Sequence, residues 1–167
     1  MLRKLLLSYF LYILAVTGSY AQSYHIRTYT ANDGLSQNYV SCMLQDSEGY
    51  LWFGTLDGLN RFDGYEFKVF KNDPTDSNSL SYNDISALHE DKRGYIWVVS
   101  RDGAIDVYNR NDQTFLRLED LPGFPERSIM VETQTIQEDK SGDIWLRNHN
   151  YIIHIQNDGI KNGKWAK

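Results

Sequence analysis

The 167-residue chain has a single cysteine, Cys42, so it contains no internal disulfide. The neighbouring residues Val40 to Leu44 are typical of a strand, and we expect Cys42 to be a small buried apolar side chain rather than a reactive thiol. Basic residues are also few, because 17 Lys and Arg stand against 22 Asp and Glu, for a net charge of −5. Nucleic-acid binding needs clustered positive charge, so this balance argues against a nucleic-acid partner.

Motifs of catalysis are missing as well. The chain has no Gly-rich phosphate loop, no Gly-x-Ser-x-Gly elbow and no kinase motif. No close metal-ligand spacing connects its four histidines, His25, His89, His149 and His154. His149 and His154 are five residues apart, which in a strand places them on opposite faces. Asp46 and Glu48 belong to one turn, whereas a glycosidase needs two carboxyls across a cleft. We therefore predict no catalytic residue, no metal and no cofactor.

A long apolar run occurs only at the N-terminus. Arg3 and Lys4 precede the mostly apolar run from Leu5 to Val16, and Ser19-Tyr20-Ala21 has small residues where a signal peptidase reads. The run is shorter than the roughly 20 residues that cross a bilayer. We predict a signal peptide over residues 1–21, with an uncleaved anchor as the alternative, and hence a periplasmic location. Its removal leaves 15 basic and 22 acidic residues.

What the chain does have is a short sequence motif, here called the recurring phrase, that occurs three times. Its pattern is Asp, two variable residues, Gly, one variable residue, Leu or Ile, and Trp, and the copies are 45 and 48 residues apart. A period of about 40–50 residues is typical of β-propeller blades. Asp bonds backbone N–H groups two residues on, and Gly supplies the positive φ of a tight turn. The recurring positions are Asp46, Gly49 and Trp52, Asp91, Gly94 and Trp97, and Asp139, Gly142 and Trp145.

Each copy therefore predicts a hairpin, and two copies continue with an Asp-Gly dipeptide that is typical of a second hairpin turn, Asp57-Gly58 and Asp102-Gly103. The first copy predicts strands over residues 38–45, 51–55, 59–62 and 66–70, and the second over 85–90, 96–100, 105–108 and 114–118. The third lacks the Asp-Gly turn but keeps a strand over 151–155. The linkers repeat too, as Leu35-Ser36 and Leu80-Ser81 show.

Four short antiparallel strands make one propeller blade. We predict an all-β fold, a partial β-propeller of about three four-stranded antiparallel blades in a seven-bladed ring. Blade 1 covers residues 34–78, blade 2 covers 79–120, and an incomplete blade 3 covers 121–167. Residues 22–33 are expected to be a lone N-terminal strand that closes the ring, because Ile26 to Tyr29 echoes the last strand of each blade.

The length of the chain bears on this prediction. Seven blades need on the order of 320 residues. We expect the chain to be the first part of a longer protein or a truncated gene product. A three-blade arc has open edges, so poor solubility or a broad unfolding transition is expected of it alone.

The stretch Asn32-Asp33-Gly34-Leu35-Ser36 with Gln45 to Gly64 resembles the two-component regulator propeller repeat. The resemblance covers nearly all of residues 24–156, strongly in the first copy, well in the second, and weakly after Trp145. It implies the periplasmic sensor region of a bacterial hybrid two-component regulator, with seven-bladed propellers, a membrane helix and a histidine kinase in one longer, homodimeric protein. It also implies a glycan-derived ligand such as an oligosaccharide.

Repeated residues hold every blade alike, so we expect the recurring Asp to cap backbone and the recurring Trp to pack between blades, rather than to act as acids, metal ligands or sugar platforms. Ligand contacts are better sought where the repeat departs from its norm, with ordinary loop variation as the alternative for each. These positions are Tyr65, Tyr82, Arg101, Arg147, Asn148 and His149.

Three functions are consistent with these patterns. The first is the N-terminal part of a ligand-sensing propeller in two-component signal transduction. The second is part of an exported propeller polysaccharide lyase or glycosidase, which requires His, Tyr, Arg or carboxylates to converge on one loop face. The third is a truncated product without independent activity. The sequence does not identify the ligand.

Overall fold

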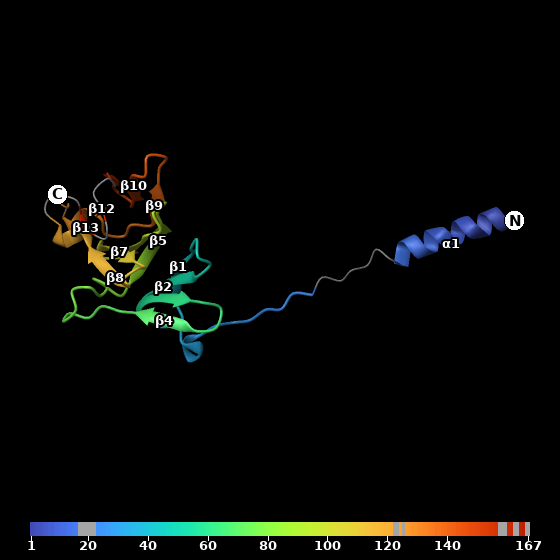
Figure 1. The fold of residues 1–167 in the computed structure, drawn as a ribbon, viewed down its shortest axis with the longest axis horizontal. Coiled ribbons are helices and arrows are strands. Elements are labelled where there is room, and N and C mark those ends of the chain that lie inside the picture. Colours follow the sequence, from blue (N-terminus) through green and yellow to red (C-terminus); the bar gives the residue numbers. More distant parts are fainter. Residues whose placement is uncertain (17–22, 122–123, 125, 157–159, 162–163, 166–167) are drawn as a thin grey trace.

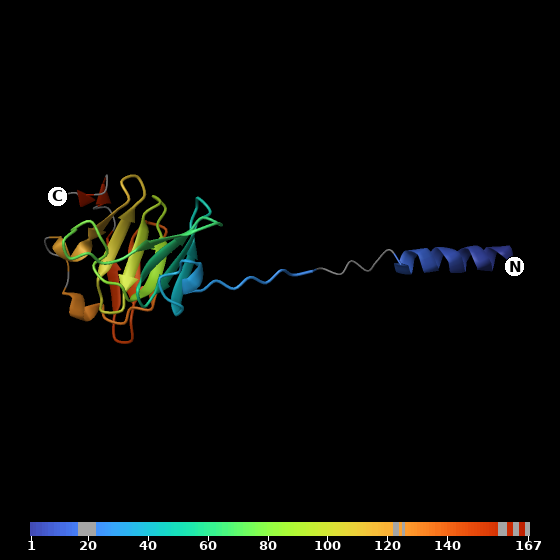
Figure 2. The same ribbon diagram turned by 90° about the horizontal axis from the view of Figure 1, so that it is seen from below.

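The structure, a computed structural model, describes residues 1–16, 23–121, 124, 126–156, 160–161 and 164–165. It begins with helix α1 (Leu2–Val16) and is otherwise built from strands, with three short 3-10 turns. Figures 1 and 2 show α1 well away from the strands. No helix in the described residues is long and apolar enough to cross a membrane. The predicted cleavage after Ala21 lies outside the described residues.

The strands form three antiparallel sheets in which each strand pairs with the next along the chain. Blade 1 contains β1 (Val40–Gln45), β2 (Leu51–Thr55), β3 (Gly58–Phe62) and β4 (Phe67–Phe70). Blade 2 contains β5 (Ile85–Glu90), β6 (Ile96–Ser100), β7 (Ile105–Asn109) and β8 (Thr114–Arg117). Blade 3 contains β9 (Thr135–Glu138), β10 (Ile144–Arg147) and β11 (Ile152–Ile155). A separate hairpin joins β12 (Ile160–Lys161) to β13 (Lys164–Trp165).

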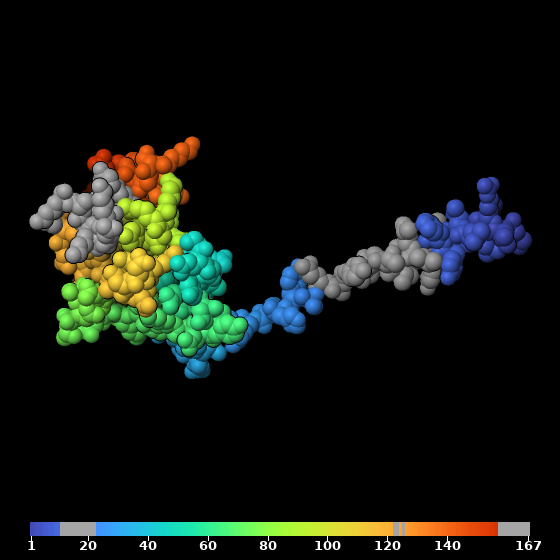
Figure 3. Space-filling model, viewed as in Figure 1, coloured from blue at the N-terminus to red at the C-terminus, as the bar shows by residue number. Residues whose placement is uncertain are grey.

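The blades follow one another across the body of the molecule, as the succession from teal through yellow to orange shows (Figure 3). The first strands β1 and β5 contact each other, as do β5 and β9, so the first strands share one edge of the arc. The prediction of an all-β fold with propeller-like antiparallel blades is confirmed. Blade 3 has three strands within the described residues.

The core lies between the blades rather than within a sandwich. In β6, Ile96 and Val98 face blade 1, whereas Trp97 and Val99 face blade 3, and all four are buried. A strand that is covered on both faces has no solvent side, which explains its unbroken apolar sequence. The core between blades 1 and 2 combines aliphatic side chains with an aromatic cluster formed by Trp52, Phe70, Tyr108 and Phe115.

Close approach of the first two blades depends on Gly54 in β2. A Cβ atom at this position would lie 2.5 Å from Cys42 Sγ and 2.7 Å from Ile85 Cγ2. Cys42 is half-buried, where the sequence led us to expect a buried side chain, and burial raises the pKa of its thiol to about 11. A raised thiol pKa lowers the fraction of thiolate, the nucleophilic form, at neutral pH.

Replacing Gly54 with Ala is expected to lower the free energy of unfolding by about 1–3 kcal/mol, because the added methyl group overpacks the interface. The midpoint of urea unfolding, followed by circular dichroism, measures this. The double variant Gly54→Ala/Cys42→Ala removes one of the clashing atoms, Cys42 Sγ, and should recover part of the loss. A neutral single variant would contradict this reading of the interface.

The N-terminal segment before blade 1 packs on that blade through Tyr29. Residues 23–30 pair with no strand in the described structure. Tyr29 instead lies against Phe62 and Phe67 on the outward face of blade 1, with ring centroids 5.0 and 5.7 Å apart. A strand needs a neighbouring strand for its backbone hydrogen bonds, and no strand in the described residues lies beside this segment. That residues 22–33 close a ring stays a prediction, as do the blade boundaries.

Strand ends differ from the predictions by one or two residues. β4 begins at Phe67 rather than Glu66, because Asp63 Oδ1 accepts the N–H groups of Tyr65 and Glu66 at 2.8 Å and keeps Glu66 in the turn. The last strand of blade 2 ends at Arg117, since Leu118 starts a 3-10 turn.

Candidate functional site

Each recurring Asp holds both its own turn and its own Trp. Asp46 Oδ1 accepts the N–H groups of Glu48 (3.0 Å) and Tyr50 (2.9 Å), and Asp46 Oδ2 accepts the Trp52 indole N–H at 2.7 Å. One carboxylate thus binds both the turn amides and the Trp indole, which must lie at fixed offsets from the Asp in the sequence. This requirement accounts for the recurring phrase. The same contacts recur at Asp91, with Arg93, Tyr95 and Trp97, and at Asp139, with Ser141, Asp143 and Trp145. The turn glycines Gly49, Gly94 and Gly142 have φ of +93°, +85° and +94°.

These hydrogen bonds lower the pKa of two of the three carboxyls, Asp91 and Asp139. Burial raises the pKa of Asp91, but bonds from the Trp97 indole and from Arg93, with the charge of Arg93, outweigh burial and leave the pKa below its usual value. The bond from Trp145 is the largest cause of the lowered pKa of Asp139. A carboxylate that accepts three donors is ionised at neutral pH, so neither residue has a proton to donate as a general acid.

The Asp-Gly turns lie at the opposite ends of the blades, where the linkers between blades also run. We call this side the linker edge; it comprises the turns at Asp57-Gly58 and Asp102-Gly103 and the described linker residues 71–84, 118–121, 124 and 126–134. Gly103 has φ of +91°, and a Cβ there would lie 2.5 Å from the carbonyl oxygen of Arg127. The glycine therefore admits the linker of the next blade.

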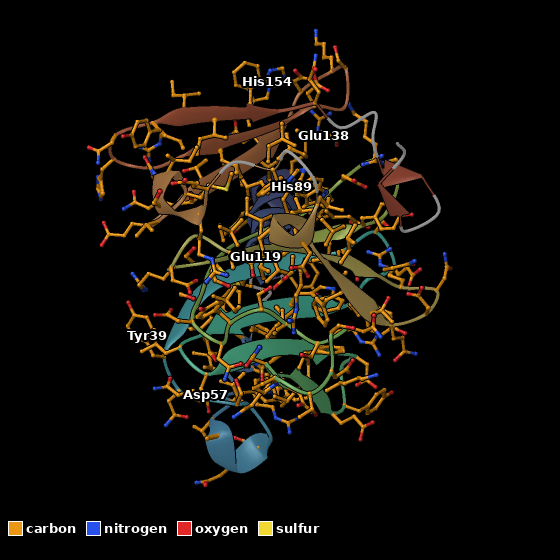
Figure 4. All side chains as sticks on the ribbon, turned by 90° about the vertical axis from the view of Figure 1, so that its left-hand side faces the viewer. Tyr39, Asp57, His89, Glu119, Glu138 and His154 are labelled. Atoms are coloured by element: carbon orange, nitrogen blue, oxygen red, sulfur yellow. The ribbon has the colours of Figure 1, made fainter. Side chains whose placement is uncertain are left out.

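An open polar pocket of about 650 Å³ lies at the linker edge, between the two linkers. Its lining includes Asn72, Tyr82, Asp84, Arg117, Glu119 and Arg127. With Asn83, the pocket thus combines one aromatic ring, two guanidinium groups, two carboxylates and two amides, all contributed by linkers or strand ends. Glu119 is visible near the centre of Figure 4.

Hydrogen bonds hold the walls of this pocket in place. Arg117 donates to the carbonyl oxygens of Asp76 (3.1 Å) and Ser79 (3.3 Å), which fixes the linker between blades 1 and 2. The Arg127 guanidinium lies 4.5 Å over the centre of the Tyr82 ring and pairs with Glu119. A site whose side chains are already held by neighbours loses little entropy when a ligand binds.

Two of the six residues singled out from the sequence lie at the pocket. Tyr82 is 42% exposed and lines it, and Arg101 forms an ion pair with the lining residue Asp84 at 3.0 Å. Tyr65 is 93% exposed in the β3–β4 turn, at the other end of its blade. It does not line this pocket.

The other three, Arg147, Asn148 and His149, are consecutive: Arg147 ends β10, and Asn148 and His149 begin the connection to β11. None of the three lines the pocket. Asn148 is buried and donates to the carbonyl oxygens of Ile129 and Val131, at 2.8 and 3.2 Å, so it holds the linker to blade 3. His149 Nε2 lies 2.9 Å from Gln134 Nε2. The sequence did not point to Arg127 or Glu119, because their linker has no counterpart in the repeat.

One cluster in the described residues has the composition of a metal site. Ligand atoms of Asp139, Asp143 and His154 lie within 4.8 Å of one another. His154 Nε2 is 2.9 Å from Asp143 Oδ2, and the His154 ring stacks on Trp145 with centroids 4.2 Å apart. Because Asp139 already accepts three N–H groups in its turn, an ion pair and a turn account for the cluster. The absence of a metal site stays a prediction.

Comparison with known proteins decides the nature of the repeat. The model of the family described as Two component regulator propeller matches residues 34–57 and 79–102, which run from each linker to the following Asp-Gly turn. The chain carries two-component regulator propeller repeats. Among curated proteins, Histidine kinase P4 of Formosa agariphila is 53% identical over 53 residues, which cover 32% of this chain and 4% of the kinase.

Solved structures of extracellular domains have a fold similar to that of this chain. The extracellular domain of BT3049 from B. thetaiotaomicron, described as a hybrid two component system, matches with a TM-score of 0.68 and 27% identity, over 78% of this chain and 19% of that one. The extracellular domain of the hybrid two component system BT4673 matches with a TM-score of 0.54 and 26% identity, over 70% and 16%. The chain therefore spans less than a fifth of these relatives.

Proposed function

We propose that this chain is the N-terminal part of a periplasmic, ligand-sensing β-propeller in a two-component signal transduction protein. The observation that carries the proposal is the occurrence of the regulator propeller repeat in both blade 1 and blade 2, on a fold shared with extracellular domains of hybrid two component systems. The apolar run and small residues of the first 21 positions support export.

In this proposal the remaining blades and a membrane-anchored histidine kinase belong to the same longer, homodimeric protein. Ligand binding would favour one arrangement of the propellers and so shift the equilibrium of the kinase. The chain itself contributes binding and no catalysis, since its recurring carboxylates are engaged in turns and its pocket carboxylates Asp84 and Glu119 are ion-paired.

We place a glycan-derived ligand, such as an oligosaccharide, in the pocket at the linker edge. Sugars offer hydroxyl groups that both donate and accept hydrogen bonds, together with an apolar ring face that packs on aromatic rings. The pocket offers the exposed Tyr82 ring beside guanidinium, carboxylate and amide groups. Loops on a rigid scaffold are where propellers and other repeat folds place such contacts.

Tyr82→Ala is expected to weaken oligosaccharide binding roughly tenfold, because it removes the aromatic wall of the pocket. Isothermal titration calorimetry with a panel of neutral and uronic-acid oligosaccharides measures the affinity of the exported chain. Tyr65→Ala is the matched control, since Tyr65 is 93% exposed and remote from the pocket. Equal affinity of the Tyr82 variant and the unchanged chain would show that the oligosaccharide does not bind in this pocket.

A polysaccharide lyase or glycosidase remains the second candidate, because the pocket does gather Tyr82, Arg127 and two carboxylates on one loop face. A lyase or hydrolase would shorten the oligosaccharides of the same panel, which chromatography of the incubated mixture detects. Unchanged oligosaccharides that bind the chain favour the sensor.

A further inference from the structure

Four charged side chains line the pocket at the linker edge, and three of them are paired with an opposite charge. Asp84 lies 3.0 Å from the Arg101 guanidinium. Glu119, labelled in Figure 4, pairs with Arg127. Arg117, the fourth, forms no ion pair with any carboxylate of the described residues. The lining therefore contains one positive charge that no contacting carboxylate balances.

Hydrogen bonds hold the Arg117 guanidinium from one side. Its Nε donates to the carbonyl oxygen of Ser79 at 3.3 Å, and its Nη2 donates to the carbonyl oxygen of Asp76 and to the Ser79 hydroxyl, both at 3.1 Å. All of these acceptors are uncharged and belong to the linker between blades 1 and 2. Nη1 donates to no atom of the described residues. Arg117 thus combines a fixed orientation with unused N–H groups.

The carboxyl of Asp106 is opposite Arg117 in the register of β7 and β8, but the two side chains form no ion pair within the described part of the chain. Both Asp106 oxygens are engaged elsewhere, since they accept the N–H and the hydroxyl of Ser81 at 2.9 and 2.6 Å. Burial raises the pKa of Asp106, and the bonds from Ser81 and the charge of Arg117 offset only part of that rise. The Arg117 charge acts on this buried carboxyl at a distance and stays available on the side of the pocket.

We propose that Arg117 binds an acidic group of the ligand, so that the pocket takes an oligosaccharide carrying a carboxylate or a sulfate ester. This inference rests on the proposed function, of which it names the ligand class. A guanidinium donates charged hydrogen bonds to the oxygens of either group, and such bonds are stronger than those between neutral groups. Tyr82 supplies the aromatic contact for the sugar ring beside it.

Isothermal titration calorimetry of the full chain tests the ligand class with three series of oligosaccharides of equal length: uronic-acid, sulfated and neutral. At least one acidic series should bind roughly 10- to 100-fold more tightly than the neutral series, because it gains hydrogen bonds to a charged donor. The acidic series that gains identifies the group as a carboxylate or a sulfate. Added salt should narrow the difference, since it screens a partly exposed charge.

Arg117→Gln should abolish the preference for acidic oligosaccharides, and Arg117→Lys, which keeps the charge, should retain part of it. Arg117 also holds the linker, so the readout is the ratio of acidic to neutral affinity, which a displaced linker alone would leave unchanged. Arg61→Gln is the matched control. It removes the same charge from β3, where Arg61 lies 4.6 Å over the Tyr50 ring and outside the pocket, and should keep the preference.

A measurement on the unchanged chain complements the variants. In nuclear magnetic resonance titrations with the acidic series, the Arg117 Nε–H resonance should shift, and the Arg61 resonance should stay in place. The neutral series should move the Arg117 resonance less at equal saturation.

Three outcomes would overturn the inference: equal affinity for acidic and neutral oligosaccharides, an Arg117→Gln chain that keeps the preference, or an Arg61→Gln chain that loses as much of it. If Tyr82→Ala still weakens binding in any of these cases, only the ligand class fails and the proposed function stands. If the unchanged chain binds no series at all, the proposed function fails, and this inference fails with it.

Discussion

Replacing Trp52 with Ala is expected to lower the free energy of unfolding by about 3–5 kcal/mol. The Trp52 side chain is fully buried between blades 1 and 2, where its ring stacks on Phe70 at 5.8 Å and meets the edge of Tyr108 at 5.2 Å. Truncation opens a cavity in this aromatic core. It also leaves Asp46 Oδ2 without the indole donor at 2.7 Å. The loss is comparable to the whole stability of a small domain.

Trp145 is the matched control for this experiment. It occupies the same position of the repeat and donates the same indole bond, to Asp139 Oδ2 at 2.9 Å, but 39% of it is exposed. Trp145→Ala should therefore cost less than about 1 kcal/mol. The midpoints of urea unfolding of the two variants give the comparison. Equal losses would mean that burial between blades does not set the contribution of the recurring Trp.

The contrast between these two residues shows what the sequence could predict. The recurring phrase specifies its own turn and the start of its own strand, because Asp, Gly and Trp act within seven residues of one another. The strands of blades 1 and 2 were accordingly predicted to within two residues. Exposure of Trp145 depends instead on whether another blade covers it, and no local pattern carries that information.

The candidate pocket was harder to predict for a related reason. Tyr82 was found because it interrupts a repeated linker, and repetition makes a departure visible. Arg127 and Glu119 lie in a linker that has no counterpart, so nothing marked them before their contact with Tyr82 and with each other was seen. The N-terminal residues 23–30 echo a last strand in sequence but have no neighbouring strand to pair with in the described part of the chain. Strand pairing depends on the partner as well as on the segment itself.

Asp106→Asn is expected to stabilise the chain by about 3 kcal/mol at pH 8. The Asp106 carboxyl is fully buried and accepts the Ser81 N–H at 2.9 Å and the Ser81 hydroxyl at 2.6 Å. Burial raises the pKa of Asp106 to about 6, from an ordinary value of 3.8. The folded chain therefore binds a proton more tightly than the unfolded chain, and ionising this side chain costs stability.

The sign of the pH dependence follows. Below pH 3.8 the carboxyl is neutral in both states and the folded state carries no penalty from it. As the pH rises toward about 6, the unfolded chain loses the proton first, so the contribution of Asp106 to stability falls with pH and is lost above the folded pKa. Urea midpoints of Asp106→Asn should therefore exceed those of the unchanged chain most at pH 8, and the difference should shrink toward pH 4.

Blade 1 supplies the control, because it has Asn60 where blade 2 has Asp106. Asn60 Oδ1 accepts the Ser36 N–H, and Asn60 Nδ2 donates to the Ser36 hydroxyl, both at 2.8 Å. The amide thus makes both linker bonds without a buried charge, which is why an amide is expected to serve at position 106. Asn60→Asp should do the reverse: it buries a carboxylate, turns the donor to the Phe53 carbonyl at 3.2 Å into an acceptor, and destabilises the chain increasingly as the pH rises. Two results would contradict this account: a lower urea midpoint for Asp106→Asn than for the unchanged chain at pH 8, or an Asn60→Asp variant whose stability does not depend on pH. Either would show that the hydrogen bonds to the linker serine, and not the buried charge, determine how much this contact contributes to stability.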